Sequence, residues 1–101
     1  MNVNLNQQSG EARLALSGRF DFTCHGGFKK AYDQAFAASG IERLVVDMRE
    51  VEYLDSSALG MLLLLRDKCK TLNKQVSLAN CTGAVRDVLR VANFDKLFTL
   101  H

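Results

Sequence analysis

Residues 44–60 read LVVDMREVEYLDSSALG, and this stretch decides the fold. The opening Leu44-Val45-Val46 is a compact apolar run rich in β-branched residues, which predicts the central strand of a sheet, buried on both faces. Residues 49–54 are expected to form a turn. The apolar periodicity that follows predicts a helix over residues 56–72, ended by Asn73 in a left-handed conformation. A buried strand followed closely by a helix is typical of an α/β protein.

Upstream of this stretch, the sequence predicts two strands and a helix. Residues 12–16 are apolar and partly alternating and run into a Ser17-Gly18 turn, so they are expected to form a strand. A weaker strand precedes them at residues 3–6. Apolar side chains then recur at helical spacing, which predicts an amphipathic helix over residues 26–39 closed by Gly40.

Downstream, the alternation of strand and helix continues. Residues 76–79 are expected to form a strand, and apolar residues repeat at helical spacing over residues 85–92, behind Thr82 as N-cap and before Asn93 as the stop. Residues 97–100 are expected to form a short last strand. The chain is therefore predicted to be an α/β domain, with a mixed β-sheet of about four to five strands packed against about three to four helices.

Length and composition indicate a single globular domain over residues 1–101. The chain is 48% hydrophobic and 24% charged, as in ordinary folded proteins, and a formal net charge of +2 with both signs interspersed argues against nucleic-acid binding. No signal peptide or membrane-spanning run is apparent, so a cytoplasmic protein is expected. The cysteines, Cys24, Cys69 and Cys81, fit neither a disulfide framework nor a zinc pattern. They are expected to be reduced and buried, and no metal or cofactor is expected.

The helix predicted over residues 56–72 has two distinct faces when its residues are plotted at 100° per residue. One face is expected to pack on the core, and it carries Ala58, Leu62, Leu65, Cys69 and Leu72. The opposite face carries Ser56, Gly60, Leu63, Leu64 and Asp67. Leucines on an outward face beside a glycine suggest a docking surface for another protein. The alternative is that a neighbouring loop of the same chain covers Leu63 and Leu64.

Gly60 lies one turn inside this helix, where glycine costs about 0.5–1 kcal/mol relative to alanine. A compensating role is therefore expected. Without a Cβ, Gly60 lets another backbone approach the Ser56 hydroxyl, which predicts access for a partner. The alternative is a close packing contact within this chain.

Asp55 and Ser56 are both good N-cap residues, and capping alone accounts for their position before an apolar run. A phosphate on Ser56 would meet the free N–H groups and the positive end of the helix dipole. The fold would tolerate it, while about −1.5 to −2 of added charge would change the surface beside Asp55. Ser57 is a second hydroxyl that such a reaction could use.

The stretch from Val45 to Gly60 resembles the strand-loop-helix signature of STAS domains, which usually reads D-S-S-G-L-G where this chain has Asp55-Ser56-Ser57-Ala58-Leu59-Gly60. Residues 17–21, SGRFD, resemble the family's early segment, and residues 80–94 resemble its closing helix and loop. The similarity spans nearly the whole chain. Within the STAS domains, the resemblance is to the bacterial anti-sigma factor antagonists.

This resemblance implies a regulatory switch that is not an enzyme. In that family the serine after the aspartate, matched by Ser56, is phosphorylated by a GHKL-type serine kinase and dephosphorylated by a PPM-type phosphatase. The unphosphorylated form binds the kinase or anti-sigma factor. The resemblance also implies that Asp21 lies near the phosphoacceptor and that Asp55 flanks it. Ala58 replaces the usual glycine, and the segment His25-Gly26-Gly27 departs from the family pattern in a way that bears on partner identity.

Two other functions remain open. An enzyme would need Ser56 paired with His25 or His101, but no nucleophile elbow, P-loop or dinucleotide motif is present. A constitutive STAS subunit of a lipid-transport ATPase or stressosome-like assembly would need no phosphorylation cycle. A sheet edge near the termini is compatible with a monomer or a weak homodimer.

Overall fold

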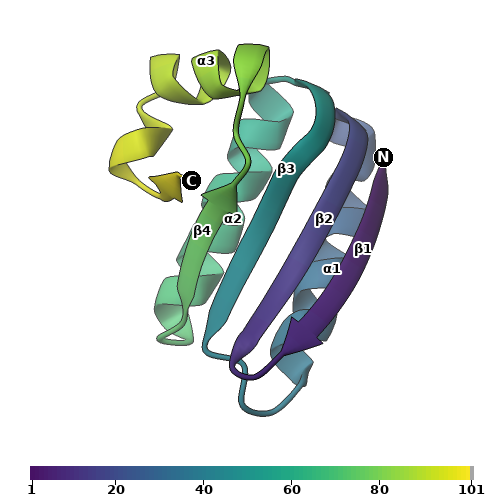
Figure 1. Ribbon diagram of the computed structural model, residues 1–101, viewed down its shortest axis with the longest axis vertical. Helices are drawn as coiled ribbons and strands as arrows, with labels where there is room; N and C mark the ends of the chain where they lie inside the picture. The colour runs from purple at the N-terminus through teal and green to yellow at the C-terminus, as the bar shows by residue number, and fades with distance from the viewer. Residues whose placement is uncertain (101) are drawn as a thin grey trace.

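The computed structural model describes residues 1–100 as a five-stranded sheet with helices (Figure 1). The elements are β1 (Asn2–Gln8), β2 (Glu11–Phe20), the 3-10 helix η1 (Phe22–Cys24), α1 (His25–Ala37), β3 (Arg43–Leu54), α2 (Ser56–Thr71), β4 (Gln75–Ala79), α3 (Gly83–Val91), the 3-10 helix η2 (Phe94–Lys96) and β5 (Thr99–Leu100). The strands lie in the order in which they occur in the chain, β1-β2-β3-β4-β5. β1 is antiparallel to β2, and the other pairs are parallel, so the predicted mixed sheet and α/β class are confirmed.

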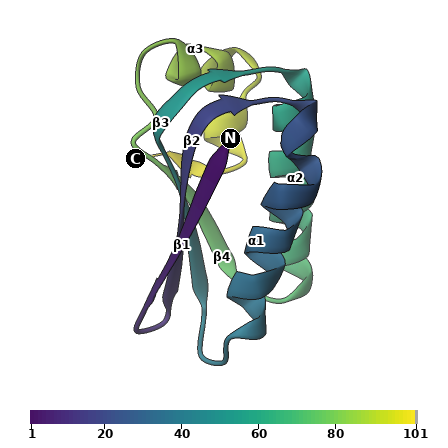
Figure 2. The ribbon, with the colours of Figure 1, turned by 90° about the vertical axis from the view of Figure 1, so that its right-hand side faces the viewer.

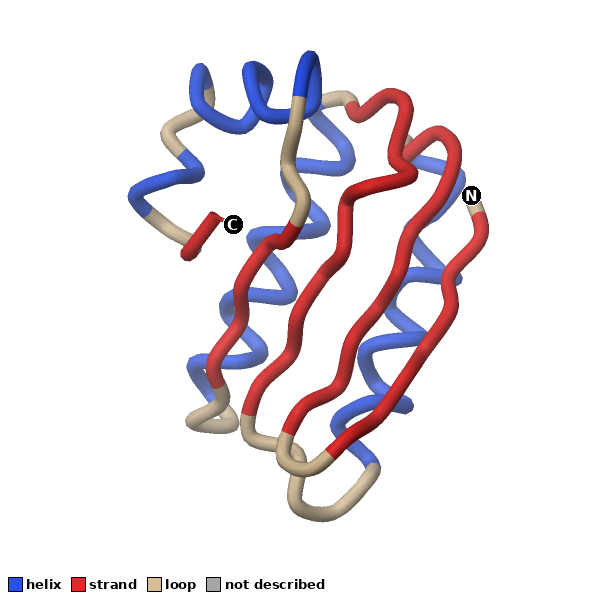
Figure 3. The backbone as a smooth tube through the Cα atoms, in the orientation of Figure 1, coloured by secondary structure: helices blue, strands red, loops and turns tan. Residues whose placement is uncertain are grey.

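Helices α1 and α2 cover the same face of the sheet, while the other face has no helix against it (Figure 2). This arrangement follows from the strand order, because successive crossovers of one hand that advance in one direction leave their helices on one side. Helix α3 lies across the end of the sheet where β3 leads into α2 (Figures 1 and 3). The loops gather at the two ends of the strands, as the tube in Figure 3 shows.

The core lies between the sheet and helices α1 and α2. Phe20 of β2 packs on Phe28 of α1 with ring centroids 5.1 Å apart, and Phe28 meets Tyr32 edge-on at 5.4 Å. The central strand β3 contributes Leu44 and Val46 on the helix side and Val45 on the other, and all of them are buried. The prediction of a central strand buried on both faces at this point is therefore confirmed.

The prediction of a turn over residues 49–54 is wrong, because β3 continues to Leu54. Its pairing with β2 shifts register twice, between Ala15 and Ser17 and between Gly18 and Arg19. It then continues with Arg19 opposite Tyr53 and Phe20 opposite Leu54. These irregularities let β3 bury Val51 and Leu54 at a spacing of three. The longer strand carries the chain to the far end of the sheet before α2 begins.

The helix ends also differ in detail from the sequence predictions. α1 ends at Ala37 with an extended Ala38, and Gly40 lies beyond it in the loop with φ +84°. α2 ends at Thr71, so Leu72, predicted to be core, is 42% exposed as the C-cap. Asn73 adopts the predicted left-handed conformation, with φ 57°. Asn93, predicted to end its helix, is also left-handed, with φ 62°.

Candidate functional site

Strands β2 and β3 end side by side, and this brings the candidate site together. Phe20 pairs with Leu54, and the backbone N–H of Asp55 donates to the Phe20 carbonyl at 3.4 Å. Asp21 and Asp55 therefore follow neighbouring strands at the same end of the sheet. Ser56 comes next and begins α2.

Asp55 alone caps α2. Its backbone is extended, and its Oδ1 accepts the N–H of Ala58 at 3.1 Å. The prediction that Ser56 also serves as a cap is wrong, because Ser56 lies within α2 as its first residue and the N-cap is Asp55. The side chains of Ser56 and Ser57 are both exposed, and within residues 1–100 neither hydroxyl makes a hydrogen bond. The Ser56 hydroxyl is thus available to a partner.

Asp21 is held at the same corner by its own turn. Its Oδ1 accepts the backbone N–H of Thr23 at 3.0 Å and the Thr23 hydroxyl, and it caps η1. These hydrogen bonds lower the pKa of Asp21 below its usual value, and Arg19, 3.9 Å from Oδ2, adds to the effect. The corner therefore carries a carboxylate that stays ionised at neutral pH. The Arg19 guanidinium also lies 4.0 Å from the ring centroid of Tyr53.

The outward face of α2 is uncovered. Leu63 is 37% exposed and Leu64 is 53% exposed, while Gly60 and Asp67 are also exposed. Within residues 1–100 no loop buries the two leucines, so that alternative is wrong. A Cβ built on Gly60 would meet no atom within 4 Å, which also excludes the close internal contact considered for this glycine.

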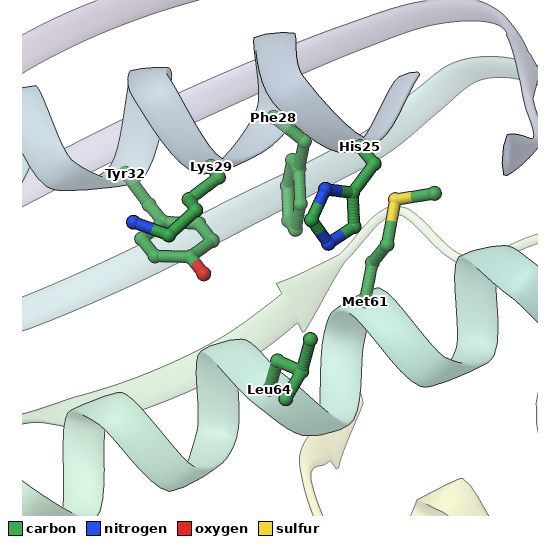
Figure 4. A pocket seen from close by; sticks show the side chains of 6 residues that line it. All are labelled: His25, Phe28, Lys29, Tyr32, Met61 and Leu64. Carbon is green, nitrogen blue, oxygen red and sulfur yellow. The ribbon is translucent and has the colours of Figure 1, made fainter. Parts of the chain in front are cut away.

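A groove runs beside Gly60, between the start of α1 and the start of α2. Its volume is about 410 Å³, and its lining residues are Phe22, His25, Ser57, Gly60, Met61 and Leu64. Next to it, the space between α1 and α2 is too narrow for a water molecule, because Phe28 and Tyr32 of α1 lie opposite Met61 and Leu64 of α2 (Figure 4). The groove is therefore a shallow apolar surface with Ser57 on its rim.

Phe22 and Met61 belong to this surface and were not predicted from the sequence. Phe22 is 71% exposed, the second most exposed of the large hydrophobic side chains in the part of the chain described. Met61 is buried and forms the floor of the groove. The only sequence signal for Phe22 is an aromatic residue directly after Asp21, at the point where β2 ends.

The remaining candidates do not form a catalytic or metal site in the part of the chain described. His25 lines the groove, but it does so beside Ser57 and not Ser56, and His101 lies outside the described residues. Residues 1–100 contain no cluster of three or more metal-ligating side chains. Cys24, Cys69 and Cys81 are free and buried, as predicted, and burial raises the pKa of the Cys69 and Cys81 thiols to about 11. No helix among the described residues has the length and apolar character needed to cross a membrane.

The sequence over residues 3–100 matches the protein family described as "Mlab, STAS domain". The chain belongs to this family. It is also 50% identical over 90 residues to a STAS-domain containing protein of Pseudomonas aeruginosa (strain UCBPP-PA14), covering 89% of this chain and 87% of that protein.

Solved structures with the same fold include anti-sigma factor antagonists. One from Mycobacterium paratuberculosis superposes with a TM-score of 0.85 at 23% identity, over 99% of this chain and 84% of that one. The antagonist SpoIIAA in its unphosphorylated form gives a TM-score of 0.82 at 15% identity, over 99% and 88% of the two chains. The phosphorylated form of SpoIIAA from Bacillus gives 0.74 at 14% identity, over 99% and 91%. The fold of the present chain is the one that these structures share.

Proposed function

We propose that this chain is a protein-binding switch of the anti-sigma-factor-antagonist type, turned off by phosphorylation of Ser56. In the unphosphorylated state it binds a GHKL-type serine kinase or anti-sigma factor, and a PPM-type phosphatase restores that state. The observation that carries the proposal is that Asp55 and Ser56 have different roles at the start of α2. Asp55 caps the helix, while the Ser56 hydroxyl is exposed and unbonded within residues 1–100.

The separate roles of Asp55 and Ser56 matter because phosphorylation can act as a switch only if it leaves the fold intact. A phosphate on Ser56 does not remove a capping interaction, since the cap belongs to Asp55. The phosphate also sits near the first N–H groups of α2, where the helix dipole favours negative charge. Phosphorylation therefore alters the surface without unfolding the domain.

The surroundings of Ser56 explain why the added charge would act as a switch. Asp21 and Asp55 already place two carboxylates at this corner, and the groove with Phe22 and Leu64 lies next to it. A phosphate on Ser56, next to the groove, must lose water when a partner closes over this corner, and it repels any acidic group on that partner. The existence of phosphorylated and unphosphorylated SpoIIAA structures with the same fold supports such a cycle.

Replacing Gly60 by alanine separates the stability of the helix from access to the docking surface. Gly60→Ala should raise the free energy of unfolding by about 0.5–1 kcal/mol, because alanine is the better helix former and its Cβ meets no atom of this chain. It should also weaken partner binding by about tenfold, because the methyl group stands where a partner approaches Ser56. Chemical denaturation and titration calorimetry measure the two effects.

The control for this change is Thr71→Ala, at the exposed far end of the same helix and away from the groove. It should leave partner affinity unchanged. If Gly60→Ala also leaves affinity unchanged, no partner approaches α2 at this point.

The proposed function is tested by mapping where phosphate is added. The purified chain is incubated with ATP and either an extract of its own cells or a candidate kinase, and the product is analysed by peptide mass spectrometry. Phosphate is expected on Ser56 in the wild type and in Ser57→Ala, and none is expected in Ser56→Ala. Incorporation that follows Ser57 instead would overturn the assignment of the acceptor.

A further inference from the structure

Strand β1 forms a long free edge of the sheet. It pairs with β2 on one side only, over all of its residues from Asn2 to Gln8. Figure 1 shows β1 at the outer edge, and Figure 2, viewed from that side, shows no element lying across it. The opposite edge is β5, which is only two residues long. Of the two outermost strands in the described part of the chain, β1 therefore leaves the longer row of backbone hydrogen-bonding groups free.

This edge lacks the features that usually prevent strands from adding to it. Natural sheets protect their edges with charged side chains, proline or bulges. β1 reads NVNLNQQ, with no charge and no proline, and its register with β2 is unbroken. Seven regular, uncharged residues are long enough to pair with another strand.

The side-chain pattern of β1 is self-complementary. Val3 and Leu5 are half-buried and pack against the core on the helix side, opposite Leu16 and Leu14 of β2. Asn2, Asn4 and Asn6 are exposed and, by the alternation of a strand, point to the other face. A two-fold axis through Asn4 sets Val3 opposite Leu5, Asn2 opposite Asn6, and Asn4 opposite itself. Every apolar residue then meets an apolar residue, and every asparagine meets an asparagine.

We infer that the occupant of this edge is a second copy of the chain, paired antiparallel through β1 about Asn4. Such a pairing is isologous and closed, so it produces a dimer and not a fibre. It joins the two sheets into one, with the helices of both copies on the same face. A copy is favoured over an unrelated peptide because the match of Val3 with Leu5 and of the asparagines with one another is built into the chain's own sequence.

The dimer has a consequence for the docking surface. An axis normal to the sheet reverses the strand direction, so the two Ser56 corners lie at opposite ends of the shared sheet. Both remain accessible, and β1 contains neither Ser56 nor any residue of the groove. The dimer dissociation constant should therefore be the same for Ser56→Ala and Ser56→Asp. A failure of the proposed function would leave the inference about the dimer unaffected, and the reverse also holds.

Sedimentation equilibrium of the full chain, from micromolar to millimolar concentration, tests this inference. The wild type should show a reversible monomer–dimer equilibrium. Asn4→Lys and Asn4→Glu each place like charges face to face and should raise the dimer dissociation constant about fivefold or more. An equimolar mixture of the two variants should recover dimer, because lysine then lies opposite glutamate.

Thr71→Lys, on the exposed end of α2, adds the same charge away from β1 and should dimerise like the wild type. Circular dichroism checks that the Asn4 variants remain folded. A wild type that is monomeric at all concentrations would overturn the inference. The inference would also be overturned if both Asn4 variants dimerise as strongly as the wild type, or if the equimolar mixture of the two variants forms no more dimer than either variant alone.

Discussion

Phosphorylation of Ser56 is expected to weaken binding of the partner about a hundredfold, which corresponds to about 3 kcal/mol. The phosphate adds about −1.5 to −2 charge at the start of α2, next to the groove over which a partner is proposed to close. Asp21 and Asp55 flank the same corner, and Arg19 already lies 3.9 Å from Asp21. The phosphate therefore adds its charge beside two carboxylates. A cost of this size separates a bound from an unbound state at ordinary cellular concentrations.

Titration calorimetry with an identified partner measures the effect on three forms of the chain. The phosphorylated protein should bind weakly, Ser56→Ala should bind like the unmodified protein, and Ser56→Asp, with one charge, should fall between them. Thr71→Asp is the control for charge alone, since it lies fifteen residues along the same helix, about 22 Å away at 1.5 Å per residue. Equal retention of the partner by Ser56→Ala and Ser56→Asp would instead favour a constitutive STAS subunit.

The neighbouring leucines Leu62 and Leu63 should respond in opposite ways to substitution. Leu62 is fully buried between α2 and the sheet, so Leu62→Ala is expected to lower the free energy of unfolding by about 2–5 kcal/mol. Leu63 is 37% exposed on the outward face, so Leu63→Ala should change the free energy of unfolding by about 0.5 kcal/mol or less. The difference arises because only the first change leaves a cavity.

Urea denaturation gives both free energies, and a pull-down gives the effect on binding. Leu63→Lys should weaken partner binding while the melting temperature stays nearly unchanged. A large thermal loss for Leu63→Lys would show that Leu63 contributes to the core and not to docking. A small loss for Leu62→Ala would contradict the packing of α2 on the sheet.

The fold class could be predicted from the sequence because its main signals are periodic. Leu44-Val45-Val46 is a clear buried strand, and the repeats in α1, α2 and α3 each present one apolar face. The end of β3 could not be predicted in the same way. Its buried residues Val51 and Leu54 are three apart, since the register with β2 shifts, and this spacing does not resemble a strand.

The candidate site was only partly predictable. The outward position of Gly60, Leu63, Leu64 and Asp67 followed from helical geometry, and the structure agrees with it. The same helical geometry placed Leu72 on the core face, but helical geometry does not show where a helix ends, and α2 ends at Thr71.

Two further features of the site depend on the tertiary structure. Asp55 and not Ser56 caps α2, because the cap falls where β3 stops. Phe22 contributes to the groove through a single exposed ring, which has no periodic signal in the sequence.

The most direct test of the central claim is the modification state of the chain in its own cells. The protein is isolated from cells grown under several conditions, and its intact mass and phosphopeptides are measured. We expect a phosphorylated fraction that changes with condition and carries its phosphate on Ser56. Phosphate found only elsewhere, or none on Ser56 under any condition, would contradict the claim that this residue is the switch.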